Sequence, residues 1–234
     1  MTQATQQKTA LVTGGSRGLG NALSHGLAAA GWNLIIDGRD PATLEQARRS
    51  LDTTVTAIAG DIADPRHRSA LAVAVDEIGR LDLYVANAGT LGPSPLPPLA
   101  SVDEEELAEV YRINVIAPIL LFQAVRPALE AAEGIVMAIT SDAAHGDWPG
   151  WGAYGSSKAA LEQAVNVLGS EHPQLRVYSV DPGDMRTNMH QLAFPGEDIS
   201  DRPEPTSVVP GILELIASRP ENGRHAIAQQ PVTP

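Results

Sequence analysis

Tyr154 and Lys158 are the side chains in this sequence whose types and spacing best suit acid–base chemistry. They are four residues apart, so in a helix they lie one above the other on the same face. A phenol with an ordinary pKa of about 10 is a poor base at neutral pH, but a neighbouring ammonium group favours its phenolate form. The pair therefore predicts a tyrosine that exchanges protons with a bound alcohol or carbonyl group, although such pairs more often lie on a surface.

Ser141 could assist the same chemistry from the end of an expected strand. A hydroxyl at that place could donate a hydrogen bond to a substrate carbonyl oxygen as the oxygen gains negative charge. A serine at the end of a strand is more often a cap. The assignment therefore depends on which other groups reach the same edge of the sheet.

A different chemistry is indicated by the glycine-rich segment Thr13–Gly20, which reads T-G-G-S-R-G-L-G. It follows an expected strand directly and leads into a segment with a helical spacing of leucines. Glycine lets a backbone approach a pyrophosphate, whose charge is then held by unpaired N–H groups at a helix N-terminus. This strand–turn–helix context predicts dinucleotide binding more strongly than the glycines do alone.

The rest of the chain supplies the elements that would position these groups. Short β-rich apolar runs alternate with longer segments of helical period, the pattern of a parallel sheet covered by helices on both faces. We predict an α/β fold with one doubly wound parallel sheet of about seven strands in a single domain. The expected strands are Thr9–Thr13, Asn33–Asp37, Val55–Ala59, Leu81–Ala86, Gly134–Ser141, Leu175–Asp181 and, more weakly, Arg224–Ala228.

Composition argues against several other classes of protein. The 234 residues suit one large domain, and the net charge of −12 argues against binding to nucleic acid. The absence of cysteine excludes disulfides and cysteine-based zinc sites. No metal site is predicted, because the six histidines are scattered and we expect most of them on the surface. We see no apolar run that approaches the roughly 18 residues of a membrane-spanning helix, so no membrane partner is expected.

Residues 1–7 are expected to form a flexible tail before a single catalytic domain over residues 8–234. The tail lacks the pattern of a secretory signal, so we expect a cytoplasmic protein. A loop over about 184–205 is rich in proline and glycine, and we expect it to carry substrate contacts and its distal half to face water and move as a lid. Ser101 is expected to cap a helix whose first turn contains the acidic residues 103–106.

The spacing T-G-x-x-x-G-x-G makes the chain resemble the short-chain dehydrogenase/reductase family, from about Lys8 to the last expected strand. The resemblance implies a Rossmann-type fold and an oxidoreductase that moves hydride between a nicotinamide cofactor and a ketone or secondary alcohol. It also implies a homodimer or homotetramer built through two long helices. The chain departs from the pattern before Asn87, where a second asparagine is often found, and in its short tail, Gln229–Pro234. Further motifs of the family occur in the family's order, at Asp61–Ile62, Asn87–Gly89 (N-A-G), Tyr154–Lys158 (Y-x-x-x-K) and Pro182–Thr187 (P-G-x-x-x-T).

The resemblance also assigns roles to single residues. Asn114, Ser141, Tyr154 and Lys158 match the catalytic tetrad of the family. By the same resemblance, Lys158 would hold the nicotinamide ribose and Asn114 would support a water in a proton relay. The residues expected to bind the cofactor are Gly14, Ser16, Arg17, Gly18, Leu19, Gly20, Arg39, Asp61, Ile62, Asn87, Ala88, Gly89, Tyr154, Lys158, Pro182, Gly183, Met185 and Thr187.

Pro118 lies four residues after Asn114 in a segment of helical spacing, so it cannot donate a hydrogen bond to the Asn114 carbonyl. We expect a local kink there and a free carbonyl that would suit the water of the relay. A kink made only for packing is the alternative.

The residues after the second expected strand bear on the choice of cofactor. Asp37 lies 17 residues beyond Gly20, close to the position of an acid that selects NAD by binding the ribose 2′-hydroxyl. In the family's pattern that acid belongs one residue later, where this chain has Gly38 followed by Arg39. Together with Arg17, Arg39 suits a 2′-phosphate. We therefore expect NADP(H), with NAD(H) bound by Asp37 as the alternative.

Apolar residues near these motifs indicate the kind of substrate. We expect an open, apolar pocket that accepts aromatic or bulky ketones and disfavours sugars and charged acids. The protein is thus expected to be a carbonyl reductase, and the alternatives are an NAD-dependent alcohol dehydrogenase and a non-catalytic NADP(H)-sensing protein. The expected pocket residues are Leu91, His145, Trp148, Trp151, Met185, Met189, Leu192 and Phe194, with His190 as a further candidate.

Overall fold

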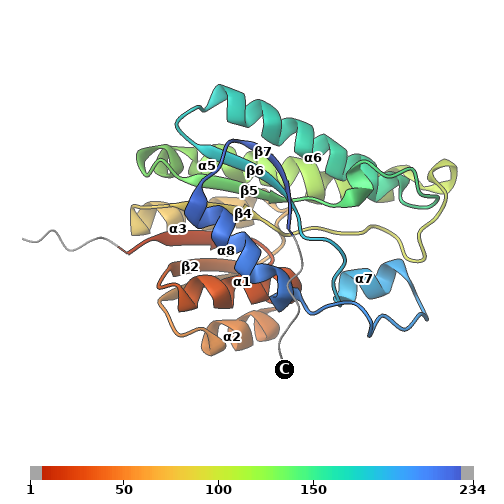
Figure 1. Ribbon diagram of the computed structural model, residues 1–234, viewed down its shortest axis with the longest axis horizontal. Coiled ribbons are helices and arrows are strands. Elements are labelled where there is room, and N and C mark those ends of the chain that lie inside the picture. Colours follow the sequence, from red (N-terminus) through yellow and green to blue (C-terminus); the bar gives the residue numbers. More distant parts are fainter. Residues whose placement is uncertain (1–6, 228–234) are drawn as a thin grey trace, which may run out of the picture.

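A seven-stranded parallel sheet forms the centre of the protein (Figure 1). The computed structural model describes residues 7–227, and the strand order in its sheet is β3-β2-β1-β4-β5-β6-β7. Each pair of neighbouring strands runs parallel. The strands are β1 (Thr9–Val12), β2 (Asn33–Gly38), β3 (Val55–Ala59), β4 (Leu83–Ala86), β5 (Ile135–Ile139), β6 (Arg176–Asp181) and β7 (Gly223–Ala226).

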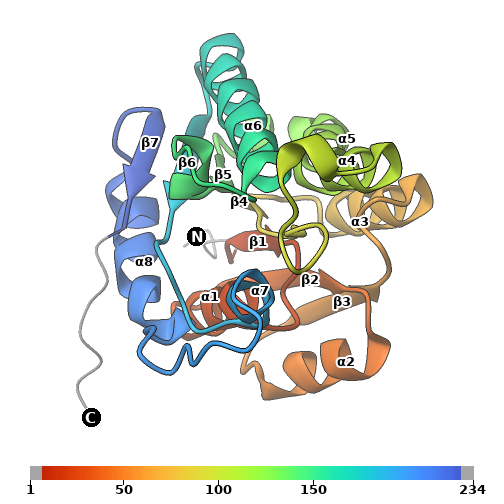
Figure 2. The ribbon, with the colours of Figure 1, turned by 90° about the vertical axis from the view of Figure 1, so that its right-hand side faces the viewer.

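Helices cover both faces of this sheet (Figure 2). The helices α1, α2 and α8 contribute to the core on one face, and α3, α5 and α6 contribute to the core on the other. The predicted doubly wound architecture is therefore confirmed. The α-helices are α1 (Gly18–Ala29), α2 (Pro41–Ser50), α3 (Pro65–Ile78), α4 (Glu104–Tyr111), α5 (Ala117–Ala131), α6 (Gly152–Glu171), α7 (Asn188–Ala193) and α8 (Val209–Ser218), with 3-10 turns η1 (Leu99–Ser101), η3 (Asp142–Ala144) and η4 (Pro205–Val208) and a π turn η2 (Arg112–Ile116).

The strands form because their residues are apolar on both faces. In β2, Leu34 and Ile36 join one core while Ile35, between them, joins the other. Such continuous apolar runs are typical of parallel strands that are buried on both sides. The same alternation explains why the strand positions could be read from the sequence.

The predicted strands are all present, with small differences at their ends. The fifth was expected over Gly134–Ser141 and is shorter, Ile135–Ile139, because the chain leaves the sheet and turns into η3. The seventh begins one residue earlier than expected, at Gly223, and Ala228 lies outside the described residues. Most of the expected tail 1–7 and all of Gln229–Pro234 also lie outside them.

The acidic helix start is confirmed, but its expected cap is wrong. The Asp103 carboxylate accepts a hydrogen bond of 2.8 Å from the Glu106 N–H, so Asp103 is the N-cap of α4. Ser101 lies earlier, in the turn η1. Aspartate is as good a cap as serine, and it lies one residue before the helix, which is the position that a cap requires.

The helical segment around Pro118 widens instead of breaking. Between α4 and α5 the chain makes the π turn η2, in which the Ala117 N–H donates to the Arg112 carbonyl. This shift of the hydrogen-bond ladder by one residue lets the helix continue through a residue that lacks an N–H. Asn114 lies inside the π turn. The irregularity that the sequence predicted is therefore present at Asn114, as a bulge.

The continuous helical run Glu104–Ala131 is long and apolar enough to cross a membrane by length and composition, with a mean hydropathy of 1.3. This differs from the expectation that no apolar stretch approaches that length. Of its apolar window, 44% is buried inside the protein. Leu121, Phe122 and Val125 pack in the core beside α3 and α6, as in a helix that covers a sheet.

The strand order places a crossing point between β1 and β4, because the chain winds away from this pair in both directions. Ligands of open α/β sheets bind at such a point, beyond the carboxyl ends of the strands. In Figure 2 the short helix α7 stands in front of this end of the sheet. The elements that carry the motifs therefore meet at one edge.

Candidate active site

The glycine-rich segment after β1 forms a tight turn that the N-A-G segment after β4 holds in place. A Cβ at Gly20 would lie 2.3 Å from the Gly14 carbonyl oxygen, so only glycine fits there. The Thr13 hydroxyl accepts hydrogen bonds of 3.0 Å from the N–H groups of Asn87 and Ala88. The Asn87 amide donates in turn to the Thr13 carbonyl over 2.7 Å. Two segments predicted to bind the cofactor thus form one cradle.

The N-terminus of α1 opens into this cradle. Arg17 is the N-cap residue, and its side chain makes no capping hydrogen bond to the first turn. The first N–H groups of a helix have no partner within the helix and carry a partial positive charge. Gly18, Leu19 and Gly20 form this first turn, which suits the pyrophosphate of a dinucleotide.

Asp37 points inward, toward the protein, rather than toward a ribose. It is 2% exposed, and its Oδ1 accepts a hydrogen bond of 2.6 Å from the Gly14 N–H. Its Oδ2 lies 2.9 Å from Nε2 of His67, which is also buried. We expected most of the six histidines on the surface, and His67 is an exception. Both carboxylate oxygens are already occupied by groups of the protein.

The position after Asp37 leaves no room for an acidic side chain. A Cβ at Gly38 would lie 2.6 Å from the Ser16 hydroxyl oxygen. Arg39 and Arg17 are exposed beside this place. Within residues 7–227, neither arginine forms an ion pair. Two guanidinium groups are thus available to an anion at this edge.

The structure brings the tyrosine and the lysine of the tetrad together on α6, and both are buried. The Lys158 ammonium donates to the Ile139 carbonyl over 2.8 Å and lies 5.6 Å from the centre of the Tyr154 ring. Ile139 is the last residue of β5, two residues before Ser141. A Cβ at Gly155 would lie 2.4 Å from the Ala143 carbonyl oxygen, so α6 packs closely against the turn that follows Ser141.

Ser141 begins the turn η3 and also caps it. Its hydroxyl accepts from the Ala143 N–H over 3.1 Å and donates to the Asp142 carboxylate over 2.9 Å. The alternative role of a strand-end cap is therefore real, and it leaves Ser141 beside the catalytic helix. The cap is thus observed, and the hydrogen bond from Ser141 to a substrate stays a prediction.

Asn114 is 1% exposed, and its side chain links two segments of the site. Its Oδ1 accepts from the Thr90 N–H over 2.8 Å, and its Nδ2 donates to the Thr90 carbonyl and to the Ser157 hydroxyl, each over 2.9 Å. A Cβ at Gly89 would lie 3.3 Å from Asn114 Oδ1 and 3.6 Å from Lys158 Nζ. All four residues of the predicted tetrad therefore lie around the ends of β4 and β5.

The remaining positions expected to bind the cofactor lie along the same edge. Asp61 and Ile62 follow β3, and the Asp61 carboxylate accepts from the Ala63 N–H over 2.9 Å. Pro182 and Gly183 follow β6, and a Cβ added at Gly18 would lie 3.7 Å from the Thr187 methyl group. The Met185 side chain differs from the rest, because it packs against the core on the α1 and α8 face. The glycine loop and the Pro182–Thr187 segment thus converge.

The expected loop over 184–205 contains a short helix, α7. The Thr187 hydroxyl caps it by accepting from the His190 N–H over 3.1 Å. The sequence predicted only a loop here, because prolines and glycines lie on both sides of α7. The His190 ring contacts that of Phe194, with ring centres 4.9 Å apart and an angle of 40° between the ring planes.

A small apolar cluster surrounds Tyr154 on the side of α7. Trp151 is its central member: its ring centre lies 5.9 Å from that of Tyr154 and 6.1 Å from that of Phe194. Trp148 contacts Trp151 but is half-exposed, and Leu192 is also exposed. The cluster contains Leu91, Ala143 and Tyr154, with Leu96, Trp151, Met189 and Ala193 packed against them.

His145 is an exposed side chain whose Nε2 lies 2.7 Å from Glu162 Oε2, and it is not among the residues of that apolar cluster. Its expected place in the substrate pocket stays a prediction. Within residues 7–227, no group of three or more His, Asp and Glu side chains could hold a metal ion.

Comparison with known proteins decides the family. The model of a family described as short chain dehydrogenase matches residues 8–198. The chain belongs to the short-chain dehydrogenase family. It is therefore an oxidoreductase, and its substrates are small molecules.

Relatives with names or structures agree with this membership. An uncharacterized oxidoreductase of Saccharomyces cerevisiae is 30% identical over 229 residues, which cover 97% of this chain and 87% of the yeast protein. Sepiapterin reductase of Rattus norvegicus is 33% identical over 199 residues, or 78% of this chain and 76% of the rat protein. The crystal structure of a short chain dehydrogenase from Shigella flexneri complexed with NADP is 29% identical, with a TM-score of 0.85, and the match covers 94% of this chain and 95% of that one.

Burial sets the protonation states in this short-chain dehydrogenase. Burial raises the pKa of Tyr154, a hydrogen bond with the Ser141 hydroxyl lowers it, and the charges of Asp142 and Asp181 raise it again. Burial also lowers the pKa of Lys158 to about 8, against the field of Glu162, which raises it. Without cofactor, Tyr154 is therefore a protonated phenol at neutral pH. A proton donor is ready beside an ammonium group.

The lowered pKa of Lys158 predicts an unusual pH dependence of stability. Between pH 8 and 10.5 the unfolded chain keeps a proton on this lysine that the folded chain has lost, so the folded state becomes more stable as pH rises. Measured against Lys158→Met, the free energy of unfolding of the cofactor-free protein should rise by about 3 kcal/mol over this range. Urea unfolding of both proteins at several pH values tests this. A constant difference between them would contradict it.

Proposed function

We propose that this short-chain dehydrogenase is an NADP(H)-dependent carbonyl reductase, with Tyr154 as the acid. The observation that supports this most directly is the buried, protonated Tyr154 beside the buried Lys158 and the strand-end Ser141, next to a cradle for a dinucleotide. A phenol in this state carries its proton at neutral pH and can give it to an alkoxide, which is a stronger base than a phenolate, and this is the step that a carbonyl reduction needs.

The residues present fit a nicotinamide dinucleotide. The turn at Gly14 and Gly20 has space for backbone only, and the first turn of α1 has no side-chain cap. When bound, the reduced nicotinamide supplies the hydride. The Thr13–Gly20 turn would hold the pyrophosphate, and Thr187 would bind at the other end of the cofactor.

Each residue of the tetrad has one part in the proposed reaction. Ser141 would donate a hydrogen bond to the substrate carbonyl oxygen, and Tyr154 would give that oxygen its hydroxyl proton as the carbon gains hydride. The alkoxide thus becomes an alcohol, and Tyr154 is left as a phenolate. Lys158 would stabilise this phenolate by its charge. Asn114, which is bonded to Ser157 beside Lys158, would hold the path by which the proton is replaced.

Three features support NADP(H) over NAD(H). Asp37 is buried and holds Gly14 and His67, so its carboxylate does not face a ribose hydroxyl. Gly38 packs against Ser16, which leaves no room for the acid of an NAD site. The exposed Arg17 and Arg39 supply the positive charge that a 2′-phosphate needs. The related Shigella flexneri structure is complexed with NADP.

Consumption of NADPH with a panel of ketones, quinones and diketones tests the proposal, and sugars and charged keto acids serve as contrasts. We expect NADPH oxidation with apolar carbonyl compounds. Tight NADPH binding with no turnover on any of them would favour the sensing protein instead. Oxidation of secondary alcohols with a preference for NAD would favour the alcohol dehydrogenase.

Trp151→Ala should raise KM for an aromatic ketone roughly ten-fold, because Trp151 joins Tyr154 to Phe194 in the apolar cluster. NADPH affinity should change little, since Trp151 lies on the substrate side of Tyr154. Trp148→Ala is the matched control, and its effect should be smaller because Trp148 is 45% exposed. An unchanged KM in Trp151→Ala, measured by steady-state kinetics, would remove this residue from the pocket.

The implied homodimer or homotetramer stays a prediction. It is supported by exposed apolar side chains on the two long helical segments, namely Ile116 and Leu120 around the start of α5 and Val167 on α6.

A further inference from the structure

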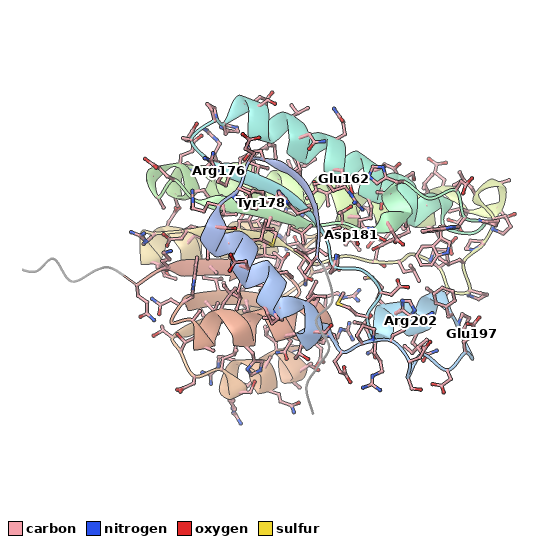
Figure 3. All side chains as sticks on the ribbon, in the orientation of Figure 1. Glu162, Arg176, Tyr178, Asp181, Glu197 and Arg202 are labelled. Carbon is pink, nitrogen blue, oxygen red and sulfur yellow. The ribbon has the colours of Figure 1, made fainter. Side chains whose placement is uncertain are left out.

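Glu162 carries a buried carboxylate on α6, one helical turn beyond Lys158, and other segments contact it from several sides. Its Oε1 accepts from the Thr140 hydroxyl over 2.6 Å and from Arg224 Nε over 3.2 Å. Its Oε2 lies 2.7 Å from His145 Nε2. Figure 3 labels Glu162 on α6 and Asp181 at the end of β6. The helix is thus tied to the end of β5, to the turn after Ser141 and to β7.

Arg224 extends this connection to the segment that follows β6. Its Nη2 donates to Asp181 Oδ2 over 2.6 Å, while its Nε donates to Glu162 Oε1. The other oxygen of Asp181 accepts from the Gly183 N–H over 3.0 Å. One guanidinium group from the edge strand β7 therefore bridges the catalytic helix and the start of the Pro182–Thr187 segment.

The contacts of this cluster lie directly beside the tetrad. Thr140, which donates to Glu162, directly precedes Ser141 in the chain. Ile139 directly precedes Thr140, and the Ile139 carbonyl accepts a hydrogen bond from the Lys158 ammonium. His145 follows the turn η3 that Ser141 begins. The cluster contacts three segments that carry the proposed catalytic and nicotinamide-binding groups, yet no member of the cluster belongs to the tetrad.

The chemistry of the bridge requires arginine. Glu162 and Asp181 are both largely buried carboxylates, and Arg224 contacts both of them, while the Lys158 charge also acts on Glu162. The planar fork of a guanidinium can donate to two carboxylates at once in fixed directions, whereas an ammonium is a single point charge. A lysine at this place would keep the charge but could not donate to both carboxylates in these directions, so at least one of the two contacts would be lost.

We propose that Arg224 and Glu162 are positioning residues for hydride transfer, which hold the Ser141 turn, the Lys158 helix and the Pro182–Thr187 segment in fixed relative places. The expected loss of catalytic rate rests on the proposed function. The expected loosening of the three segments rests on the observed contacts alone. Arg224 acts through Asp181 and Glu162.

Arg224→Lys tests the proposal, because it keeps the charge and removes the fork. We expect kcat/KM for the ketone to fall roughly a hundred-fold and NADPH affinity to fall roughly ten-fold, since small displacements of reacting groups have effects of this size. We also expect faster hydrogen–deuterium exchange in peptides covering residues 182–187 of the cofactor-free protein. These changes should be present well below the melting temperature of the variant.

Arg80→Lys is the matched control. Arg80 holds the buried Asp82 by two hydrogen bonds of 2.5 and 2.7 Å just before β4, at the amino ends of the strands and thus away from the tetrad. This variant loses a similar fork, so its melting temperature should fall, while kcat/KM, NADPH affinity and exchange over residues 182–187 stay as in the parent. A loss of the same size in both variants would show only a general loss of stability and would overturn the proposal.

The remaining outcomes also decide the question. Parent-like kinetics, affinity and exchange in Arg224→Lys would show that charge alone suffices, which overturns the positioning role. If the parent protein oxidises no NADPH, the proposed function fails, but the exchange of residues 182–187 still tests the bridge. If Arg224→Lys does not fold, Thr140→Val removes one contact of Glu162 at constant shape. Faster exchange over residues 140–145 is then expected, and unchanged exchange would overturn the proposal.

Discussion

Tyr154→Phe should lower kcat at least a hundred-fold while the affinity for NADPH stays within about two-fold of the parent value. The variant loses only the phenolic oxygen, and its ring still packs in the cluster with Leu91 and Trp151. General acid catalysis by a positioned group contributes roughly 10²–10⁴-fold. Because the phenol of Tyr154 is buried and protonated, no solvent water can easily replace it as the donor. Single-turnover kinetics and NADPH fluorescence titration measure the two quantities separately.

Tyr178→Phe is the control for this experiment. Its hydroxyl also makes a hydrogen bond, of 3.1 Å, but to the Pro220 carbonyl, away from the tetrad. Figure 3 labels this tyrosine on β6. Its removal should leave kcat unchanged. If Tyr154→Phe kept more than a few per cent of turnover while chemistry limits the rate, Tyr154 could not be the acid.

Arg39→Ala should weaken NADPH binding about ten- to a hundred-fold and NADH binding hardly at all. A hydrogen bond to a charged group contributes about 1.5–3 kcal/mol, which corresponds to this range. Arg39 is exposed directly after Gly38 and pairs with no carboxylate among the described residues, so its charge is available to a 2′-phosphate. Titration of both cofactors against the parent and the variant gives the four dissociation constants that are needed.

Arg49→Ala provides the matched control, because Arg49 is an exposed arginine of α2 that pairs with Glu45. This substitution removes the same net charge from α2, the helix that follows Arg39. It should change the affinity for NADPH and for NADH by no more than about two-fold at ordinary salt. Equal affinities of the parent protein for NADPH and NADH would refute the cofactor assignment. A similar loss for both cofactors in Arg39→Ala would show that Arg39 binds a shared part of them.

The sheet could be predicted because each strand has a local sequence pattern. Leu34, Ile35 and Ile36 are consecutive apolar residues, and such a run is by itself enough to predict a strand that is buried on both faces. The π turn could be predicted only in part. Pro118 predicts that one helical hydrogen bond is lost, but it does not predict that the helix continues by forming a π turn. The short helix α7 was missed because a six-residue helix between prolines and glycines has too little periodicity to detect.

The candidate site was predictable where its residues follow a spacing, as Tyr154 and Lys158 do. It was not predictable where contacts join residues far apart in the chain. The pairing of Asp37 with His67 spans 30 residues, and that of Glu162 with Arg224 spans 62. No local pattern marks such partners, so His67 was expected on the surface and Asp37 was left open as an alternative ribose ligand. Their burial is decided by the packing of α3 against the sheet.

The place of β7 at the edge of the sheet sets an order for the assembly of the site during synthesis. The strands of the dinucleotide cradle, β1 to β4, leave the ribosome first, whereas Arg224 belongs to the last strand that the structure describes. A domain generally folds as a unit, so the sheet is complete only when β7 has paired with β6. The bridge from Arg224 to Glu162 and Asp181 can therefore close only after nearly the whole chain has been synthesised. The last strand to be made would thus also be the one that completes the contacts around the tetrad.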